Sequence, residues 1–400
     1  MEKKDNKFIY FPSFSVGNFE SSLKKDFKFK DGTPINFYSK DYPEKYRHPY
    51  FLVTAGHFYK KMDFRAEHPG MEDALLLGDS GGFQVASGAL KWSDDLREKI
   101  FLWLERNSDV AMNLDIPPKM DYAGKFEHCL DLSKKNFKYF ADNQTGATKF
   151  LNVIQGTNEH EYKHWYQQTK DYPFNGWSIG GAGKSIYAFM SALCALVEGG
   201  EHLKAQNEFL HVLGATKITD FYVVSQIQRS FNEVNSNMVV TTDSSTPSIA
   251  VVYGYYYTEY SLRDGTFKFT HLPKRDPKFQ SGFRIPEYTE WDKEHIKKII
   301  SPDDVMDWNN EAAVAFIMHN FYFFKDAMDT IDDFVNNHNY ILAQNCPGGE
   351  KGDWIKILRS IDEMIKSDDP RLVFDRHKSL YMKISNTESK AKSTFGKFFK

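Results

Sequence analysis

Phe150–Ile154 reads FLNVI, Gly176–Ile179 reads GWSI and Phe209–Leu213 reads FLHVL, and two stretches with helical spacing of apolar residues, Glu159–Lys170 and Tyr187–Glu198, separate them. Each apolar run is followed directly by Gly or Gln. Runs this short and this apolar are typical of parallel strands that are buried on both faces. Their alternation with helices predicts strand–helix crossover units.

The same alternation continues on both sides of this stretch. Further strand-like runs are FLVT at Phe51–Thr54, ALLLG at Ala74–Gly78, VAMNLDI at Val110–Ile116 and MVVTT at Met238–Thr242, and further helical stretches are Asp94–Glu105, Phe126–Phe140 and Thr219–Phe231. Seven such units in about 200 residues predict an α/β fold, a (β/α)8 TIM barrel, more than an open sheet. The eighth strand has no clear run; Thr266–Leu272 could be that strand or part of an inserted hairpin.

The pattern changes outside the predicted barrel. The first fifty residues are rich in Phe, Lys and Asp with weak periodicity, and after about residue 290 only helical stretches follow, at Lys293–Ile300, Asn310–Phe334 and Trp354–Lys366. We expect an N-terminal extension at 1–50, a catalytic barrel at 51–290 and a C-terminal helical subdomain at 291–400. That subdomain either packs on the barrel or forms an appendage. Its basic tail, Lys390–Lys400, is interpreted as a frayed terminus.

Composition limits the class of protein. The net charge of −3 over 400 residues argues against a protein that coats nucleic acid by charge alone, although it allows a local basic groove. The three cysteines are far apart in sequence, which predicts no disulfide framework and no Cys-rich metal site. The chain begins without an apolar signal core and has no membrane-length apolar run. We expect a cytoplasmic protein without a membrane partner, and leave its oligomeric state open.

Three carboxylates follow strand-like runs. Asp79, Asp115 and Asp243 each lie where a strand is expected to end, and active sites of TIM barrels lie at that end. Each has a simpler explanation alone: Asp79 could hold a turn, Asp115 could cap a loop, and Asp243 could cap a helix at Ser244–Ile249. Together, with glycines beside them that let a ligand approach the backbone, they favour a functional site.

Glycosidic chemistry suits such a site. Cleaving a base from a sugar builds positive charge at the anomeric carbon, which one carboxylate can stabilise or trap covalently. A second carboxylate can handle the proton of the base. A third, Asp115, paired with the amide of Gln155, would suit guanine, which presents N1–H and amine donors and an O6 acceptor.

The sequence DSGGFQ at Asp79–Gln84 resembles, without a gap, the signature of the tRNA-guanine transglycosylase superfamily. Further segments resemble that family in the same order, and the resemblance runs from about residue 50 to about residue 335. These segments are Leu114-Asp115, Val153–Gly156, Ser178–Gly181, Leu213-Gly214 and the pair His319-Asn320 in an aromatic-rich stretch.

The resemblance implies an enzyme, a pentosyltransferase on a TIM barrel, and assigns roles to its residues. Asp243 would be the nucleophile that attacks the sugar, and Asp79 would contact the base and handle its proton. Phe83 would stack near the base. The residues implied to bind the base are Ser80, Phe83, Asp115, Gln155, Gly180 and Gly181.

Two departures from the family pattern bear on the substrate and the metal. Ser244–Ser248 (SSTPS) replaces the Cys-Val-X-Pro-Thr-Arg of tRNA-acting members. The segment Thr242–Ser245, with Pro247 nearby, instead resembles the DNA-modifying branch, found in phages and in bacterial DNA-modification clusters. This favours DNA over tRNA as partner, with Lys and Arg of Arg263–Arg284 as candidate phosphate contacts. If the chain is phage-encoded, it would act in the host cytoplasm. The expected reaction inserts a 7-deazaguanine base, such as 7-cyano-7-deazaguanine, for guanine through a covalent Asp–sugar intermediate.

The family's Cys-x-Cys-x-x-Cys motif for zinc is absent. Glu290, Asp292 and His295 reproduce its spacing, with His319 in the place of the last ligand, and such a ligand set is chemically possible for zinc. Charged residues at this spacing are common on surface helices, so we expect no metal and no cofactor, and a subdomain held by packing.

Three other hypotheses remain open. The same chemistry could act on tRNA, or the chain could be a non-catalytic barrel that positions nucleic acid. It could also be an unrelated barrel glycosidase, against which the DSGGFQ segment argues. The retained Asp79, Asp115 and Asp243 argue against a non-catalytic role.

Overall fold

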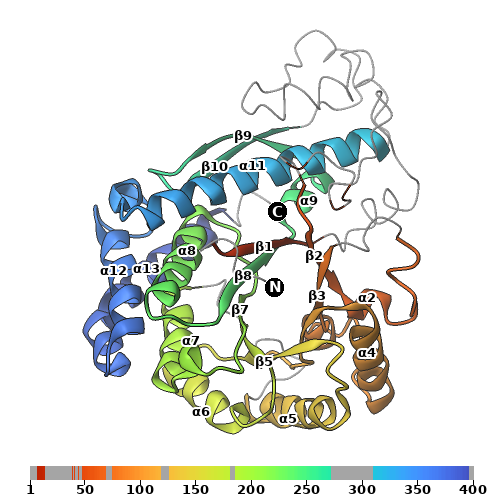
Figure 1. Ribbon diagram of the computed structural model, residues 1–400. Helices are drawn as coiled ribbons and strands as arrows, with labels where there is room; N and C mark the ends of the chain where they lie inside the picture. Colours follow the sequence, from red (N-terminus) through yellow and green to blue (C-terminus); the bar gives the residue numbers. More distant parts are fainter. Residues whose placement is uncertain are drawn as a thin grey trace.

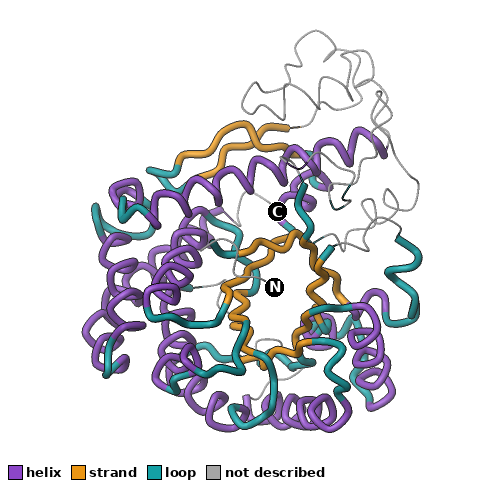
Figure 2. Tube along the Cα trace, in the orientation of Figure 1, coloured by secondary structure: helices purple, strands orange, loops and turns teal. Residues whose placement is uncertain are grey.

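The computed structural model describes residues 7–13, 38, 40, 44, 47–68, 74–118, 126–180, 185–271 and 310–395. Eight parallel strands form one sheet in the order β1-β8-β7-β6-β5-β4-β3-β2, and a parallel bridge between Ser13 and Leu52 joins its two edges into a ring (Figure 2). The expected (β/α)8 barrel is thus confirmed. The strands are β1 (Ile9–Pro12), β2 (Tyr50–Thr54), β3 (Leu75–Asp79), β4 (Val110–Met112), β5 (Lys149–Ile154), β6 (Gly176–Ile179), β7 (Phe209–Val212) and β8 (Val239–Ser244).

The eighth strand comes from the N-terminal segment, so the expected extension at 1–50 contributes to the barrel. β1 pairs in parallel with β8, with Tyr10 opposite Thr242 and Phe11 opposite Asp243. Tyr10 and Phe11 are buried in the core. Residues 266–271, the alternative candidate, instead form β10 (Thr266–His271), which pairs antiparallel with β9 (Tyr255–Ser261) in a separate hairpin.

Helices between the strands surround the ring (Figure 1). Polar residues at their N-termini explain where three of them begin, because each side chain accepts a hydrogen bond from the first turn: Ser93 from the Leu96 amide, Asn158 from the Glu161 amide, and Ser185 from the Ala188 amide. The helices that connect the strands are α4 (Asp94–Asn107), α5 (Phe126–Asn143), α6 (Glu159–Thr169), α7 (Ile186–Glu198) and α8 (Ile218–Glu233). Shorter ones are α2 (Ala55–Phe58), α3 (Gly82–Ala86) and α9 (Thr246–Val252), with 3-10 turns η3 (Glu201–Leu203) and η7 (Tyr340–Asn345).

The C-terminal helices pack on the barrel. α11 (Asn310–Asn336) lies against α8 and α9, and its Phe321 ring stacks on Tyr10 of β1 with ring centroids 6.0 Å apart. α12 (Asp353–Lys366) packs against α8, and α13 (Pro370–Phe395) packs against α7 (Figure 1). The expectation of a frayed tail from Lys390 was wrong as far as Phe395, because α13 continues to that residue. The expected helix at 293–300 lies outside the described residues.

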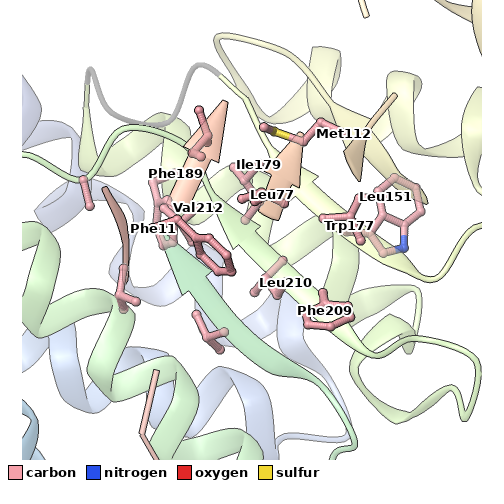
Figure 3. Close-up of a cluster of buried hydrophobic side chains, with 14 of the residues drawn as sticks. Phe11, Leu77, Met112, Leu151, Trp177, Ile179, Phe189, Phe209, Leu210 and Val212 are labelled. Carbon is pink, nitrogen blue, oxygen red and sulfur yellow. The ribbon is translucent and has the colours of Figure 1, made fainter. Parts of the chain in front are cut away.

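Apolar side chains from most strands meet in one core. Figure 3 shows buried residues of β1, β3, β4, β5, β6 and β7 packed together with Phe189 of α7, among them Phe11, Leu77, Met112, Leu151 and Trp177. Close packing of this kind fixes the strand ends relative to one another. In the described part of the chain, no helix combines the length and the apolar character needed to cross a membrane.

Candidate functional site

The polar residues selected from the sequence lie at one end of the barrel. Asp79 is the last residue of β3, Asp243 is the penultimate residue of β8, and Asp115 lies three residues beyond β4. Gln155 and Gly180 directly follow β5 and β6. Because all eight strands run parallel in one ring, these residues share its carboxyl rim. The carboxylates also influence one another: Asp243 raises the pKa of Asp79, and Asp79 raises the pKa of Asp115, each in addition to the larger effect of burial.

Asp79 both holds a turn and faces the other acids. Its Oδ1 accepts a hydrogen bond from the Gly81 amide at 3.2 Å, and the Thr54 side chain also hydrogen-bonds to this carboxylate. Burial nevertheless raises its pKa. Gly81 has φ +88°, and a Cβ there would lie 3.0 Å from the Gly56 Cα, so this turn requires glycine. A pKa raised by burial makes Asp79 a better proton donor candidate than an ordinary surface carboxylate.

Asp115 and Gln155 form a buried hydrogen-bonded pair. Gln155 Nε2 donates to Asp115 Oδ2 at 2.7 Å, and the residues are 3% and 6% exposed, respectively. Burial raises the pKa of Asp115 to about 7, although the Gln155 hydrogen bond opposes that shift. In the described structure the buried Gln155 Oε1 has no hydrogen-bond partner. Buried acceptors are nearly always paired, so an unpaired one indicates a position that a ligand or water fills.

Glycines let neighbouring loops close around this pair. A Cβ on Gly82 would lie 2.2 Å from the Asp115 carbonyl oxygen, and a Cβ on Gly180 would lie 2.1 Å from Gln155 Nε2. The Gly180 amide donates to the Ile154 carbonyl at 3.0 Å, which fixes the end of β6 beside β5. Gly82 of the DSGGFQ signature and Gly180 of the Ser178–Gly181 segment therefore each have a steric reason to be glycine.

Asp243 is anchored to the neighbouring strand. Its Oδ1 accepts a hydrogen bond from the Gly214 amide at 2.7 Å, and its side chain is 15% exposed. The simpler explanation, a helix cap, was wrong: Asp243 lies within β8, and α9 begins at Thr246 after Ser245. The sequence pattern misplaced the helix start because β8 extends through Ser244.

His211 belongs to this cluster and was missed from the sequence. It is fully buried in β7, with Nδ1 2.8 Å from Thr241 Oγ1 and Nε2 3.4 Å from Asp243 Oδ1. It was overlooked because it sits inside the apolar run FLHVL. Strand register could have found it, since His211 pairs with Thr241, two residues before Asp243, and side chains two apart on a strand share a face.

The remaining predicted base-binding residues differ in their surroundings. Ser80 is buried, and its hydroxyl donates to the Asn113 carbonyl at 3.0 Å, which ties the turn after β3 to the end of β4. Phe83, on α3, is 59% exposed. Gly181 lies outside the described residues, so its role stays a prediction. Ser80 therefore helps to hold the strand ends together, whereas the Phe83 ring is available to a ligand.

A small hollow, with about 30 Å³ of room for water-sized molecules, opens beside the cluster, between the end of β7 and helices α7 and α8. Its lining includes the apolar Ile186, Phe189 and Trp354, and the polar Lys217. Gly214, whose amide holds Asp243, also lines it.

Of the four residues considered as zinc ligands, only His319 lies within the described part of the chain. Glu290, Asp292 and His295 lie outside the described residues, and the buried His319 places Nε2 2.7 Å from the Tyr257 carbonyl. Its neighbour Asn320 accepts from the Tyr257 amide at 2.9 Å and donates to the Pro247 carbonyl at 3.1 Å. The His-Asn pair therefore ties α11 to β9 and α9. Among the residues described, no group of three or more His, Cys, Asp or Glu side chains is arranged to hold a metal ion.

No protein-family model matches this chain, and no curated protein matches it. The fold and the site define a (β/α)8-barrel protein whose carboxyl rim gathers three aspartates and a glutamine, with a buried histidine of β7 below Asp243.

Proposed function

We propose that this protein is a DNA guanine transglycosylase, which exchanges guanine in DNA for a 7-deazaguanine base such as 7-cyano-7-deazaguanine. The main support is the buried Asp115–Gln155 pair with its unpartnered Gln155 Oε1. Guanine presents two adjacent donors, N1–H and the exocyclic amine, and this pair presents a carboxylate beside an amide oxygen. Binding guanine would give the buried oxygen a partner.

Asp243 is suited to be the nucleophile. One oxygen is held by the Gly214 amide, which leaves the other to attack C1′ of the deoxyribose. In that step the C1′–N9 bond breaks, its electron pair leaves with guanine, and Asp79 supplies a proton to the departing base. The incoming deazaguanine then loses its N9 proton to Asp79 and attacks C1′, which breaks the bond to Asp243. The proton count balances over the two steps, and the raised pKa of Asp79 suits both transfers.

DNA is favoured by the segment after the nucleophile. Thr242–Ser245, with Pro247 nearby, resembles the DNA-modifying branch. Ser244 Oγ donates to Thr246 Oγ1 at 2.9 Å, and Asn320 donates to the Pro247 carbonyl. A base must leave the duplex to reach the buried pair, which costs a few kcal/mol. The exposed Phe83 offers a stacking surface against that cost. Lys268, one of the candidate phosphate contacts, forms an ion pair with Glu259 at 2.7 Å, so its ammonium group is less available to a phosphate.

The test is base exchange measured by mass spectrometry of nucleosides. Purified protein is incubated with 7-cyano-7-deazaguanine and either duplex DNA or tRNA, and each nucleic acid is then digested. We expect the modified deoxynucleoside from DNA and none from tRNA. Product from tRNA alone would reject DNA as the substrate, and product from neither would reject base exchange.

The nucleophile is tested with Asp243→Ala beside Asp131→Ala, an exposed aspartate on α5. We expect Asp243→Ala to lower exchange by on the order of 10⁴-fold, and Asp131→Ala to leave it unchanged. A protein–DNA adduct that survives denaturation should form with the unaltered protein and with Asp131→Ala only. Exchange that persists in Asp243→Ala would exclude Asp243 as the nucleophile.

A further inference from the structure

His211 contacts the proposed nucleophile from below the rim. Its Nε2 lies 3.4 Å from Asp243 Oδ1, the same oxygen that accepts from the Gly214 amide. Within the described residues, this fully buried nitrogen forms no other hydrogen bond. The distance is slightly long for a hydrogen bond, and such contacts at reaction centres shorten when the substrate binds.

The surroundings of His211 determine which ring nitrogen carries the proton. An ionised carboxylate only accepts hydrogen bonds, so a bond to Asp243 requires hydrogen on Nε2. Thr241 Oγ1, 2.8 Å from Nδ1, has a hydroxyl that can donate to the unprotonated nitrogen. The acidic groups near the ring are Asp243 and Asp79.

We propose that His211 is a positioning residue for Asp243, an inference that rests on the proposed function. Its neutral Nε2–H tautomer, held by Thr241, donates to Asp243 Oδ1. Together with the Gly214 amide it fixes that oxygen, so that the other oxygen of Asp243 faces the sugar. Two donors on one carboxylate oxygen set the orientation of the carboxylate more firmly than one donor does.

The kinetic test compares two substitutions at this position. His211→Phe keeps a ring of similar size but removes the donor, whereas His211→Gln keeps an N–H donor near the Nε2 position. A hydrogen bond to a charged group contributes enough that its loss should slow formation of the protein–DNA adduct about 10- to 100-fold in His211→Phe. The KM for DNA should be unchanged, and His211→Gln should recover most of the rate. Equal losses in both variants would overturn the proposal.

A spectroscopic test decides the same point without activity. In protein with ¹⁵N-labelled histidine, the ring signals of His211 should report the neutral Nε2–H tautomer. Asp243→Ala removes the acceptor, so the tautomer should shift to Nδ1–H, with Thr241 as acceptor. An Nδ1–H tautomer in the unaltered protein, or no change in Asp243→Ala, would reject the pairing. If the unaltered protein exchanges no base, the proposed function fails, and these signals still decide whether His211 positions Asp243.

Discussion

Gln155 Nε2 donates to Asp115 Oδ2 across 2.7 Å, and the two residues come from different strand ends, after β5 and after β4. Because Asp115 Oδ2 accepts this bond, the Gln155 amide is oriented with Nε2 toward Asp115. Gln155 Oε1 is then buried without a partner in the described structure. Such a pair is costly to bury unless something completes its hydrogen bonds. We therefore expect this pair, more than any single acid, to determine which base binds.

Asp115→Asn should weaken guanine binding. The substitution replaces one carboxylate oxygen with an amide N–H₂ donor. That donor would face either the Gln155 Nε2 donor or the N–H donors of guanine, so one hydrogen bond is lost. Losing a hydrogen bond to a charged acceptor corresponds to about a 10- to 100-fold lower affinity, measurable by calorimetry. Asp131→Asn, on the exposed face of α5, is the matched control and should bind guanine as the unaltered protein does. Equal affinity in both variants would show that Asp115 does not read the base.

Guanine affinity should depend on pH through Asp115. Its pKa is raised to about 7 by burial, so the folded protein holds this proton between about pH 4 and pH 7, where the unfolded chain has lost it. Accepting the guanine N–H groups requires the ionised form, so affinity should rise as pH increases through 7. Calorimetry from pH 5.5 to pH 8.5 should show the rise, and Asp115→Asn should flatten it.

The same proton affects stability with the opposite sign. Because the folded state binds more protons than the unfolded state in that range, Asp115 makes the free energy of unfolding fall as pH rises from about 4 to 7. Urea denaturation of the ligand-free protein at pH 5 and pH 8 should show this decrease, and Asp115→Asn should reduce it. A decrease of the same size in Asp115→Asn would assign the effect to other groups.

Most of the barrel could be predicted because its strands are buried on both faces. β2, β3, β5, β6, β7 and β8 lie within a residue or two of the expected runs, since a continuous apolar run is what a buried parallel strand requires. β4 is shorter than VAMNLDI suggested, because Asn113 Oδ1 accepts from the Leu114 amide and Asn113 O from the Asp115 amide, which forms a turn. The pattern of apolar residues alone could not predict this hydrogen bond, and so it could not predict where β4 ends.

β1 could not be found because closing a barrel is a long-range event. IYFP is too short to show a period, and the sequence of the first fifty residues has only weak periodicity. The strand that β1 pairs with, β8, is the last barrel strand in sequence. The site was predictable where a polar residue interrupts an apolar run at its end, as Asp79 and Gln155 do. His211 interrupts one in the middle, where a buried histidine is as compatible with packing as with function.

Phe83→Ala should weaken DNA binding without affecting the free base. The ring is 59% exposed on α3, the helix that follows the turn after Asp79, so it contributes little to the core and is available to stack on a nucleobase. Base stacking on an aromatic ring is worth about 1–3 kcal/mol, which predicts about 5- to 150-fold weaker binding of duplex DNA. Guanine affinity should be unchanged.

Leu102→Ala is the control for Phe83→Ala. Leu102 is 46% exposed on α4, on the outside of the barrel, and its loss should change neither binding of DNA nor binding of guanine. Fluorescence anisotropy with labelled duplex measures the first and calorimetry the second. Unchanged DNA affinity in Phe83→Ala would remove the ring from the interface.

Asn320→Ala should destabilise the fold around the proposed nucleophile. The fully buried side chain accepts from the Tyr257 amide and donates to the Pro247 carbonyl, so it connects α11 to β9 and to the first turn of α9, close after Asp243. Its removal leaves both backbone groups buried without these partners, which should lower the free energy of unfolding by about 2–4 kcal/mol in urea denaturation. Asn337→Ala, which removes one exposed bond to the Asp333 carbonyl, should change it by less than about 0.5 kcal/mol.

Because Pro247 follows Asp243 by four residues, Asn320→Ala should also slow adduct formation while the Asp115–Gln155 pair still binds guanine. Loss of guanine binding in that variant would mean that α11 supports the whole rim and not the nucleophile segment alone.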